Sequence, residues 1–567
     1  MLRKYLSSNF ALIIYFAIIF GLFLTNTVHE SYPDEFDDIL GGWYLLHGKF
    51  LYSGFFTHHN PFGYILSAGI ELVSGQSFVR FRIVYAVVLF AYMIWTYLFL
   101  KKKFIHRNIS FYLFVILLFG IGATYFWGHM LLADNLAALL ILPVFALVFL
   151  RSFYREKLIF SDMVAISILS ALAFLTAATY IYLIAAIYAY TLLFYKTENN
   201  ISFFSRKFLN VLVVFGAPYV IFLLYLLLTG SLRDYYYQNL VFNPRFYIYN
   251  YPRPEGAPVN PIRYAIIIAQ DFYNNFSTLL IGVKDFNFVF PFNMALAVVN
   301  TGLLIYLLVQ RRFSLALFMV LIVVYANVRT NVLTSRETDY QSSVYILVSF
   351  FNMVFIMRQV YEDMEKHTLT FPKKVIFSFL ILIIGIYTCF NLTFLVRKDI
   401  EKVYKKYMGV QALIYDRPQV APVINSITKS NDYVWIGPFA FEELFYTNGK
   451  VPSKYIILLP EFAKFPLIKD EFMADFEKNK PAVLYFDKAY SIRGYEPKNF
   501  APFFLDFLRQ NYITLFDYRD GKTKYVSVAQ VSEHLDLETK LYISKDHKNE
   551  IIQKLLQQNL IRKEQAK

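Results

Sequence analysis

A group of acidic residues follows the first apolar segment of the chain, which covers residues 10–24. Such a cluster is costly beside a membrane helix unless it lies at the water boundary and has a function. A carboxylate at that boundary could remove a proton from an attacking hydroxyl or amine, as an enzyme acting on a lipid-linked substrate requires. The charged and titratable residues of this stretch are Asp34, Glu35, Asp37, Asp38, His58 and His59.

Two other interpretations of residues 29–82 stay open. Runs of charge are usually solvated turns, although solvation alone does not explain why His58, His59, Asn60 and Pro61 follow in the same stretch. Carboxylates and imidazoles could also bind a divalent metal ion, so a metal is an alternative cofactor here.

The composition indicates a membrane protein. The chain has 567 residues, 57% of them hydrophobic, with 60 Phe and 46 Tyr, and its mean hydropathy is +0.43. These values exclude a soluble globular protein of this size. The net charge of +14 does not indicate nucleic-acid binding, because Lys and Arg are concentrated in short loops between apolar segments, as the positive-inside rule describes. The single cysteine, Cys389, excludes a disulfide within the chain.

The elements that must position these residues are membrane-spanning helices. Apolar windows of about 20 residues predict eleven of them, near residues 10–28, 83–100, 110–127, 132–150, 162–176, 178–195, 207–229, 288–309, 313–330, 341–357 and 375–396. Positive residues gather on one side of the membrane, at 3–4, 101–107, 151–157, 206–207, 311–312 and 358–374. This bias places the N-terminus in the cytoplasm and places loops 29–82, 128–131, 230–287 and 331–340 on the outer face.

The chain changes character after residue 397. Residues 1–397 form the predicted membrane domain, with outer loops 29–82 and 230–287. In residues 398–567 short β-rich patches at 432–436 and 482–486 alternate with polar helical stretches, which predicts a soluble α/β domain outside the membrane. This domain carries no nucleophile triad, Gly-rich phosphate loop or metal-ligand spacing. We therefore expect it to be a scaffold or an acceptor-recognition module.

The first outer loop carries a resemblance to a known family. An Asp34-Glu35 pair follows the first membrane helix, and the segment 45–52 (LLHGKFLY) precedes His58-His59-Asn60-Pro61. This arrangement resembles the GT-C superfamily of integral membrane glycosyltransferases, in particular the protein O-mannosyltransferase and aminoarabinose-transferase branch and its bacterial members. That branch usually has Pro-Pro or His-Pro-Pro where this chain has Asn60-Pro61, which leaves the role of Asn60 open. The segment 431–460 looks like the extracytoplasmic domain of the bacterial members.

The resemblance implies an inverting transfer of a sugar from a polyprenyl-phosphate donor to a protein, lipid or polysaccharide acceptor. Asp34 would be the catalytic base, with Glu35 as its neighbour and alternate. The leaving phosphate would be stabilised by cations, for which His58, His59 and Arg336 are the candidates. We expect Asp37 and Asp38 to be solvated residues at a helix start.

The resemblance extends to two further outer positions. Asp134, in the segment 128–135, is similar to the second Asp that the family carries at a helix start, although an ordinary helix N-cap explains it equally. Arg336 opens a span where the family places a basic residue near the lipid phosphate. Its alternative is a local ion pair with Glu337 or Asp339.

Outer loop 230–287 is dense in aromatic and basic side chains, among them Arg245 and Tyr247. Tyrosine faces can stack on sugar rings, and arginines can hold phosphate or anionic lipid. The alternative is a loop that lies flat on the membrane surface. Both interpretations suit a protein whose lipid-linked donor enters from the bilayer.

Two other classes of function compete with the enzyme. A transporter or flippase for lipid-linked glycans would place charged residues in mid-span and break its helices in matched halves, whereas the predicted spans are nearly free of charge. The second competing class is a catalytically inactive relative that binds glycans. The sequence therefore favours a glycosyltransferase integral to the cytoplasmic membrane, with its C-terminal domain outside the cell.

Overall fold

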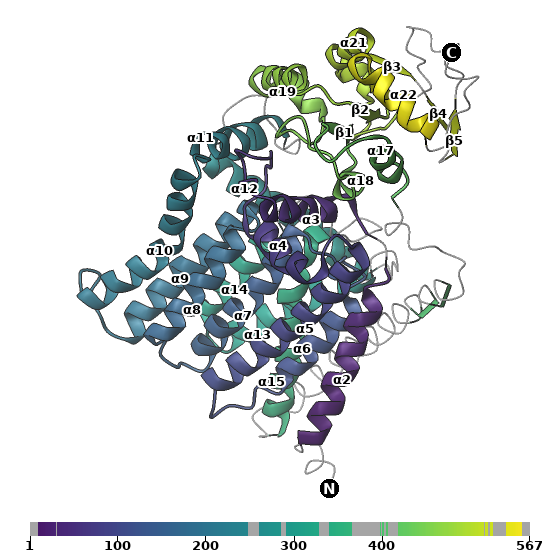
Figure 1. Ribbon diagram of the computed structural model, residues 1–567. Coiled ribbons are helices and arrows are strands. Elements are labelled where there is room, and N and C mark those ends of the chain that lie inside the picture. Colours follow the sequence, from purple (N-terminus) through teal and green to yellow (C-terminus); the bar gives the residue numbers. More distant parts are fainter. Residues whose placement is uncertain are drawn as a thin grey trace.

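The computed structural model describes residues 9–29, 31–247, 260–284, 291–327, 340–365, 418–514, 516–519, 522–525 and 540–557, with single positions 397, 400, 401, 404 and 405. Figure 1 shows a large bundle of helices and, above it, a smaller group of strands and helices. The smaller group, which includes α19 (Pro466–Lys478), lies beside α3 (Pro33–Leu46) and α11 (Leu232–Tyr235). The chain is mainly helical, as predicted.

The helices of the bundle coincide with the predicted apolar segments up to residue 365. Their bounds are α2 Asn9–Asn26, α5 Phe78–Lys103, α6 Phe111–Gly122, α7 Ala133–Phe153, α8 Phe160–Phe174, α9 Ile181–Glu198, α10 Arg206–Leu228, α13 Pro291–Val309, α14 Phe313–Tyr325 and α15 Ser343–Glu365. Six described stretches are long and apolar enough to cross a membrane, and five shorter apolar helices accompany them. Membrane character is confirmed, but the count of eleven spans is not, and the segment 375–396 lies outside the described residues.

Helix α7 forms the centre of the bundle. It is apolar on every side, and nearly all of its residues are buried, as expected of a helix with no face toward solvent or lipid. It packs against α8 and α15. Polar contacts fix the neighbouring pair α13 and α15, because Asn300 donates to Ser349 and Asn352 donates to Asn300, both at 2.8 Å. Such interhelical hydrogen bonds stabilise helix pairs where water is absent.

The prediction that residues 230–287 form a loop is partly wrong. It contains α11, a π-helical turn at Tyr236–Tyr247 and the 24-residue helix α12, Pro261–Lys284. Helix α12 packs against α13 and α14 through one apolar stripe that includes Ile268, Phe272 and Leu279. Its polar face keeps the average hydropathy low, which is why a search for continuous apolar windows missed it.

The segment predicted as the first outer loop contains two closely packed helices, α3 and α4 (Phe62–Ser74). Gly41 and Gly42 lie inside α3 and do not break the helix. A Cβ atom at Gly41 would lie 2.2 Å from Tyr64, and one at Gly42 would lie 2.6 Å from the backbone of Ala68. The two glycines therefore let α3 and α4 approach closely. Helix α3 ends at Leu46, and Gly48 lies in the turn that follows, with φ at +77°.

The C-terminal part contains a small sheet accompanied by helices. Its four-stranded sheet has the order β1 (Val434–Gly437), β2 (Val483–Phe486), β6 (Leu541–Ser544), β3 (Tyr512–Thr514). Strands β1 and β2 are parallel, and β6 runs antiparallel to both of its neighbours. The remaining elements are β4 Phe516–Arg519, β5 Lys522–Tyr525, α17 Ala421–Ile427, α18 Phe441–Phe445, α19, α20 Pro497–Phe500, α21 Pro502–Asn511 and α22 Lys548–Gln557. The exact boundary at residue 397 stays a prediction.

Specific contacts join this domain to the end of the helical bundle where α3 and α11 lie. Helix α18 packs against α3, with the Phe445 and Trp43 ring centroids 5.9 Å apart. The Phe56 amide donates to the Lys454 carbonyl at 2.7 Å. The Lys454 ammonium reaches Asp234 at 2.8 Å and Glu471 at 2.7 Å, so a single cation links α11 to α19. Residues of α3, α11 and the segment around Phe56 therefore contact the C-terminal part directly.

Candidate functional site

Asp34 lies in the first turn of α3, where Pro33 occupies the first helical position. Its half-buried carboxylate accepts a hydrogen bond from the Tyr340 hydroxyl at 2.8 Å. The Tyr32 ring stands 4.9 Å from Trp127 and 5.8 Å from Tyr340, measured between centroids. Three aromatic rings from three separate segments thus surround the helix start that presents Asp34.

Glu35 has a different environment. It is fully buried and forms an ion pair with Arg82 of α5 at 2.5 Å. Arg82 also donates to the His29 carbonyl at 3.3 Å. A carboxylate enclosed with a guanidinium in this way holds α3 against α5. Sequence reasoning passed over Arg82, although an arginine at the edge of an apolar helix is itself a signal of a partner.

The expectation that Asp37 and Asp38 are solvated is wrong. Asp38 is buried, and its carboxylate packs against Gly63, where an added Cβ would lie 2.5 Å from an Asp38 oxygen. Asp37 accepts a hydrogen bond from the Tyr64 hydroxyl at 2.9 Å. Both were misjudged because α4 folds over this face of α3, which the local sequence does not reveal.

Asp34 and Asp37 form the candidate site. They are three residues apart in one helix and therefore share a face, and both are half-buried. His59 approaches this pair, with its Nε2 atom 3.9 Å from an Asp37 oxygen. Burial raises the pKa of Asp37 to about 7, the charge of Asp34 adds to the rise, and the Tyr64 hydrogen bond opposes it. A carboxyl group of that pKa can exchange a proton near neutral pH.

The two histidines connect this site to the π-helical segment Tyr236–Tyr247. The rings of His58 and His59 are 4.1 Å apart, and the His58 ring is 4.1 Å from Tyr247. Asn60 has a positioning role, since its side chain donates to the Phe174 carbonyl at 2.6 Å. That hydrogen bond fixes residues 58–61 against the end of α8. It gives a structural reason for an asparagine at position 60.

Tyr247 is enclosed by a residue that sequence reasoning missed. The Arg493 guanidinium, from the C-terminal domain, lies 4.0 Å from the Tyr247 ring centroid, and it forms an ion pair with Glu461 at 2.8 Å. With His58 also against it, Tyr247 is part of the contact between the domains. Arg245 lies nearby in sequence, half-buried in the π-helical turn.

Asp134 lies in the first turn of α7, where a negative charge is favourable. The N-cap position is Leu132, so the N-cap interpretation of Asp134 is wrong. Its buried carboxylate accepts a hydrogen bond from the Tyr180 hydroxyl at 2.6 Å. The next residue, Asn135, donates to the Trp127 carbonyl at 2.7 Å, which connects the start of α7 to the aromatic rings beside Asp34.

Arg336 lies outside the described residues. Within the described part of the chain, no group of three or more His, Cys, Asp or Glu side chains could hold a metal ion. No protein-family model and no curated protein matches this chain. The site is therefore interpreted from its own geometry: a carboxylate pair with a neighbouring histidine, bordered by aromatic rings, at the end of the helical bundle that contacts the C-terminal part.

The raised pKa of Asp37 predicts a pH effect on stability. Because the folded value of about 7 exceeds the ordinary value of 3.8, the folded chain holds more protons than the unfolded chain between these two pH values. The free energy of unfolding therefore falls as pH rises through that window. At about 1.4 kcal/mol per pKa unit the loss is about 4 kcal/mol.

Asp37→Asn should remove this contribution and leave the variant more stable than the wild type above about pH 7. Thermal unfolding of the two purified proteins in detergent at about pH 4.5 and about pH 7.5 measures the difference. An equal fall in melting temperature for both proteins would contradict the assignment to Asp37.

Proposed function

We propose that this protein is an inverting glycosyltransferase that moves a sugar from a polyprenyl-phosphate donor to an acceptor at the outer face of the cytoplasmic membrane. The observation that carries the proposal is the placement of Asp34. Its carboxylate is half-buried at a helix start, hydrogen-bonded by Tyr340 and bordered by Tyr32 and Trp127. Aromatic faces beside a carboxylate suit a sugar ring presented to a base.

In the proposed reaction the acceptor hydroxyl or amine attacks the anomeric carbon and gives its proton to Asp34. The new bond to the anomeric carbon forms as the bond from that carbon to the phosphate oxygen breaks. The polyprenyl phosphate leaves as an anion, so it needs positive charge and hydrogen-bond donors more than a general acid. His59 and His58, and Arg336 by the family resemblance, are the proposed sources of that stabilisation.

The pairing of Glu35 with Arg82 narrows the choice of base. A fully buried carboxylate held by a guanidinium is poorly placed to accept a proton from a substrate. Asp34 is therefore the proposed base, and Asp37 is the second carboxylate of the site. Glu35 becomes a positioning residue that fixes α3 against α5.

The test is turnover by the purified full chain in lipid nanodiscs with a synthetic polyprenyl-phosphate sugar. Release of polyprenyl phosphate, measured with an acceptor extract and without it, would support group transfer. Movement of the intact donor between leaflets without bond cleavage would instead indicate a flippase. Binding without either event would indicate an inactive glycan-binding scaffold.

The proposed topology has its own test. The variants carry Cys389→Ser and one added cysteine, at position 102 or at position 478. The native residues at these positions, Lys102 and Lys478, are both exposed in the fold. A membrane-impermeant thiol reagent added to intact cells should label Lys478→Cys and leave Lys102→Cys unlabelled until the membrane is opened. The reverse pattern would overturn the assignment of the C-terminal domain to the outside.

A further inference from the structure

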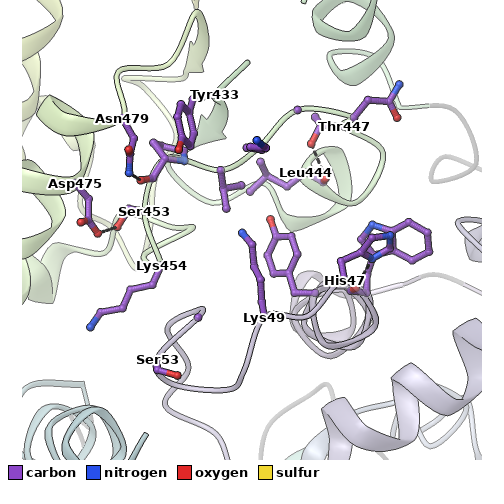
Figure 2. A pocket seen from close by; sticks show the side chains of 18 of the residues that line it. His47, Lys49, Ser53, Tyr433, Leu444, Thr447, Ser453, Lys454, Asp475 and Asn479 are labelled. Atoms are coloured by element: carbon purple, nitrogen blue, oxygen red, sulfur yellow. Dashed lines mark hydrogen bonds between the residues drawn. The ribbon is translucent and has the colours of Figure 1, made fainter. Parts of the chain in front are cut away.

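A cavity with a volume of about 940 Å³ opens between the end of α3 and the C-terminal domain (Figure 2). One wall comes from the end of α3 and the turn after it, and the other from residues 444–454 and α19. Asp34 and His47 are thirteen residues apart along the helix, which corresponds to a rise of about 20 Å. This cavity is therefore separate from the carboxylate pair at the opposite end of the same helix.

The lining combines rings with neutral hydrogen-bonding groups. Trp43, Tyr44 and Tyr433 contribute aromatic faces, while amides and hydroxyls come from residues such as Thr447 and Asn448. Rings that pack on the apolar faces of a sugar, together with groups that bond its hydroxyls, suit a saccharide. The volume lies near the top of the range for ligand cavities, roughly 300–1,000 Å³, which favours several sugar units over one.

The acidic side chains of the cavity are already engaged. Asp234 and Glu471 both bind the Lys454 ammonium, at 2.8 and 2.7 Å. Asp475 accepts a hydrogen bond from the Ser453 hydroxyl at 2.7 Å. Each carboxylate of the lining therefore has a partner inside the protein, a shared ammonium for Asp234 and Glu471 and a neutral hydroxyl for Asp475.

Two lysines of the lining are not engaged in this way. Among the residues that the structure describes, neither Lys49 nor Lys450 forms an ion pair with a carboxylate. The Lys49 ammonium lies 4.4 Å from the centroid of the Tyr44 ring, and Figure 2 shows its side chain reaching from the α3 side into the space below the C-terminal domain. Burial lowers the pKa of Lys49 to about 8, so a bound anion would replace the hydration that this amine has lost.

We infer that this cavity binds an acidic oligosaccharide, with Lys49 pairing to its carboxylate or phosphate group and the rings of Trp43, Tyr44 and Tyr433 contacting its sugars. The position of Lys49 decides the class, because this half-buried ammonium lies against the Tyr44 ring with no carboxylate paired to it among the described residues. The inference does not rest on the proposed transfer reaction. Binding is measured without donor, so either one can fail while the other stands.

The experiment is isothermal titration calorimetry of the full chain in nanodiscs made of uncharged lipid. The probes are tetragalacturonate, a phosphorylated maltotetraose and plain maltotetraose. We expect the acidic probes to bind at least ten times more tightly than the neutral one. Lys49→Gln should lower the affinity for acidic probes at least tenfold, and Lys450→Gln, at an exposed position, should lower it less.

The matched control is Lys478→Gln, which removes an exposed lysine of the same domain outside the cavity and should leave affinity unchanged. Unfolding temperatures of all three variants establish that they are folded. If only the phosphorylated probe binds, the ligand is still an acidic oligosaccharide, and phosphate is its charged group. Equal affinity for acidic and neutral probes, no binding at millimolar concentration, or a folded Lys49→Gln variant with wild-type affinity would overturn the inference.

Discussion

Replacing Asp34 with Asn is expected to reduce sugar transfer by about 100- to 10,000-fold, the usual contribution of a positioned general base. The substitution keeps the size of the side chain and an oxygen that can still accept the hydrogen bond from Tyr340. Donor binding should therefore survive, and the loss should appear in kcat and not in KM. Single-turnover release of polyprenyl phosphate, with donor affinity measured separately, gives both quantities.

The other carboxylates of α3 provide the comparison. Asp37→Asn should retain transfer and shift its pH dependence, because Asp37 contacts Tyr64 and His59 at the edge of the site. Asp506→Asn, which removes an exposed carboxylate of the C-terminal domain, should behave as the wild type does. If Asp34→Asn transfers sugar at the wild-type rate, Asp34 is not the base and the proposed mechanism fails.

The second large effect is on stability and concerns the buried pair of Arg82 and Glu35. Arg82→Gln leaves the Glu35 carboxylate fully enclosed without its cation. Breaking a buried pair from one side costs about 3–5 kcal/mol. Because the pair joins α3 to α5, the loss should lower the melting temperature of the purified protein and should disturb the position of Asp34 as well.

Two further variants separate charge from packing. Arg80→Gln removes an exposed arginine two residues away in the same helix, and its effect should stay within about 0.5 kcal/mol. The double variant Arg82→Met with Glu35→Gln removes both charges and should recover part of the stability lost in Arg82→Gln. An Arg82→Gln protein as stable as Arg80→Gln would show that this ion pair does not hold α3 in place.

Local sequence was sufficient wherever one physical signal dominated. Continuous apolar windows predicted the helices of the bundle, and β-rich patches predicted β1 and β2, because hydrophobic burial depends mainly on a residue's own type and its period along the chain. The sequence did not predict α12 as a span because polar residues such as Asp271, Asn274 and Asn275 interrupt its apolar sequence. Asp34 and the histidines could be singled out because polar groups beside a membrane helix are costly.

Tertiary structure alone decided what each of those polar residues does. The four adjacent acids are alike in sequence, yet α4 and α5 fold over them differently. Arg82 encloses Glu35, Tyr64 and His59 reach Asp37, and Tyr340 reaches Asp34, each from a distant segment. The environment of a carboxylate is set by desolvation and by partners brought from elsewhere in the chain. The cavity around Lys49 likewise exists only where the C-terminal domain meets the end of α3.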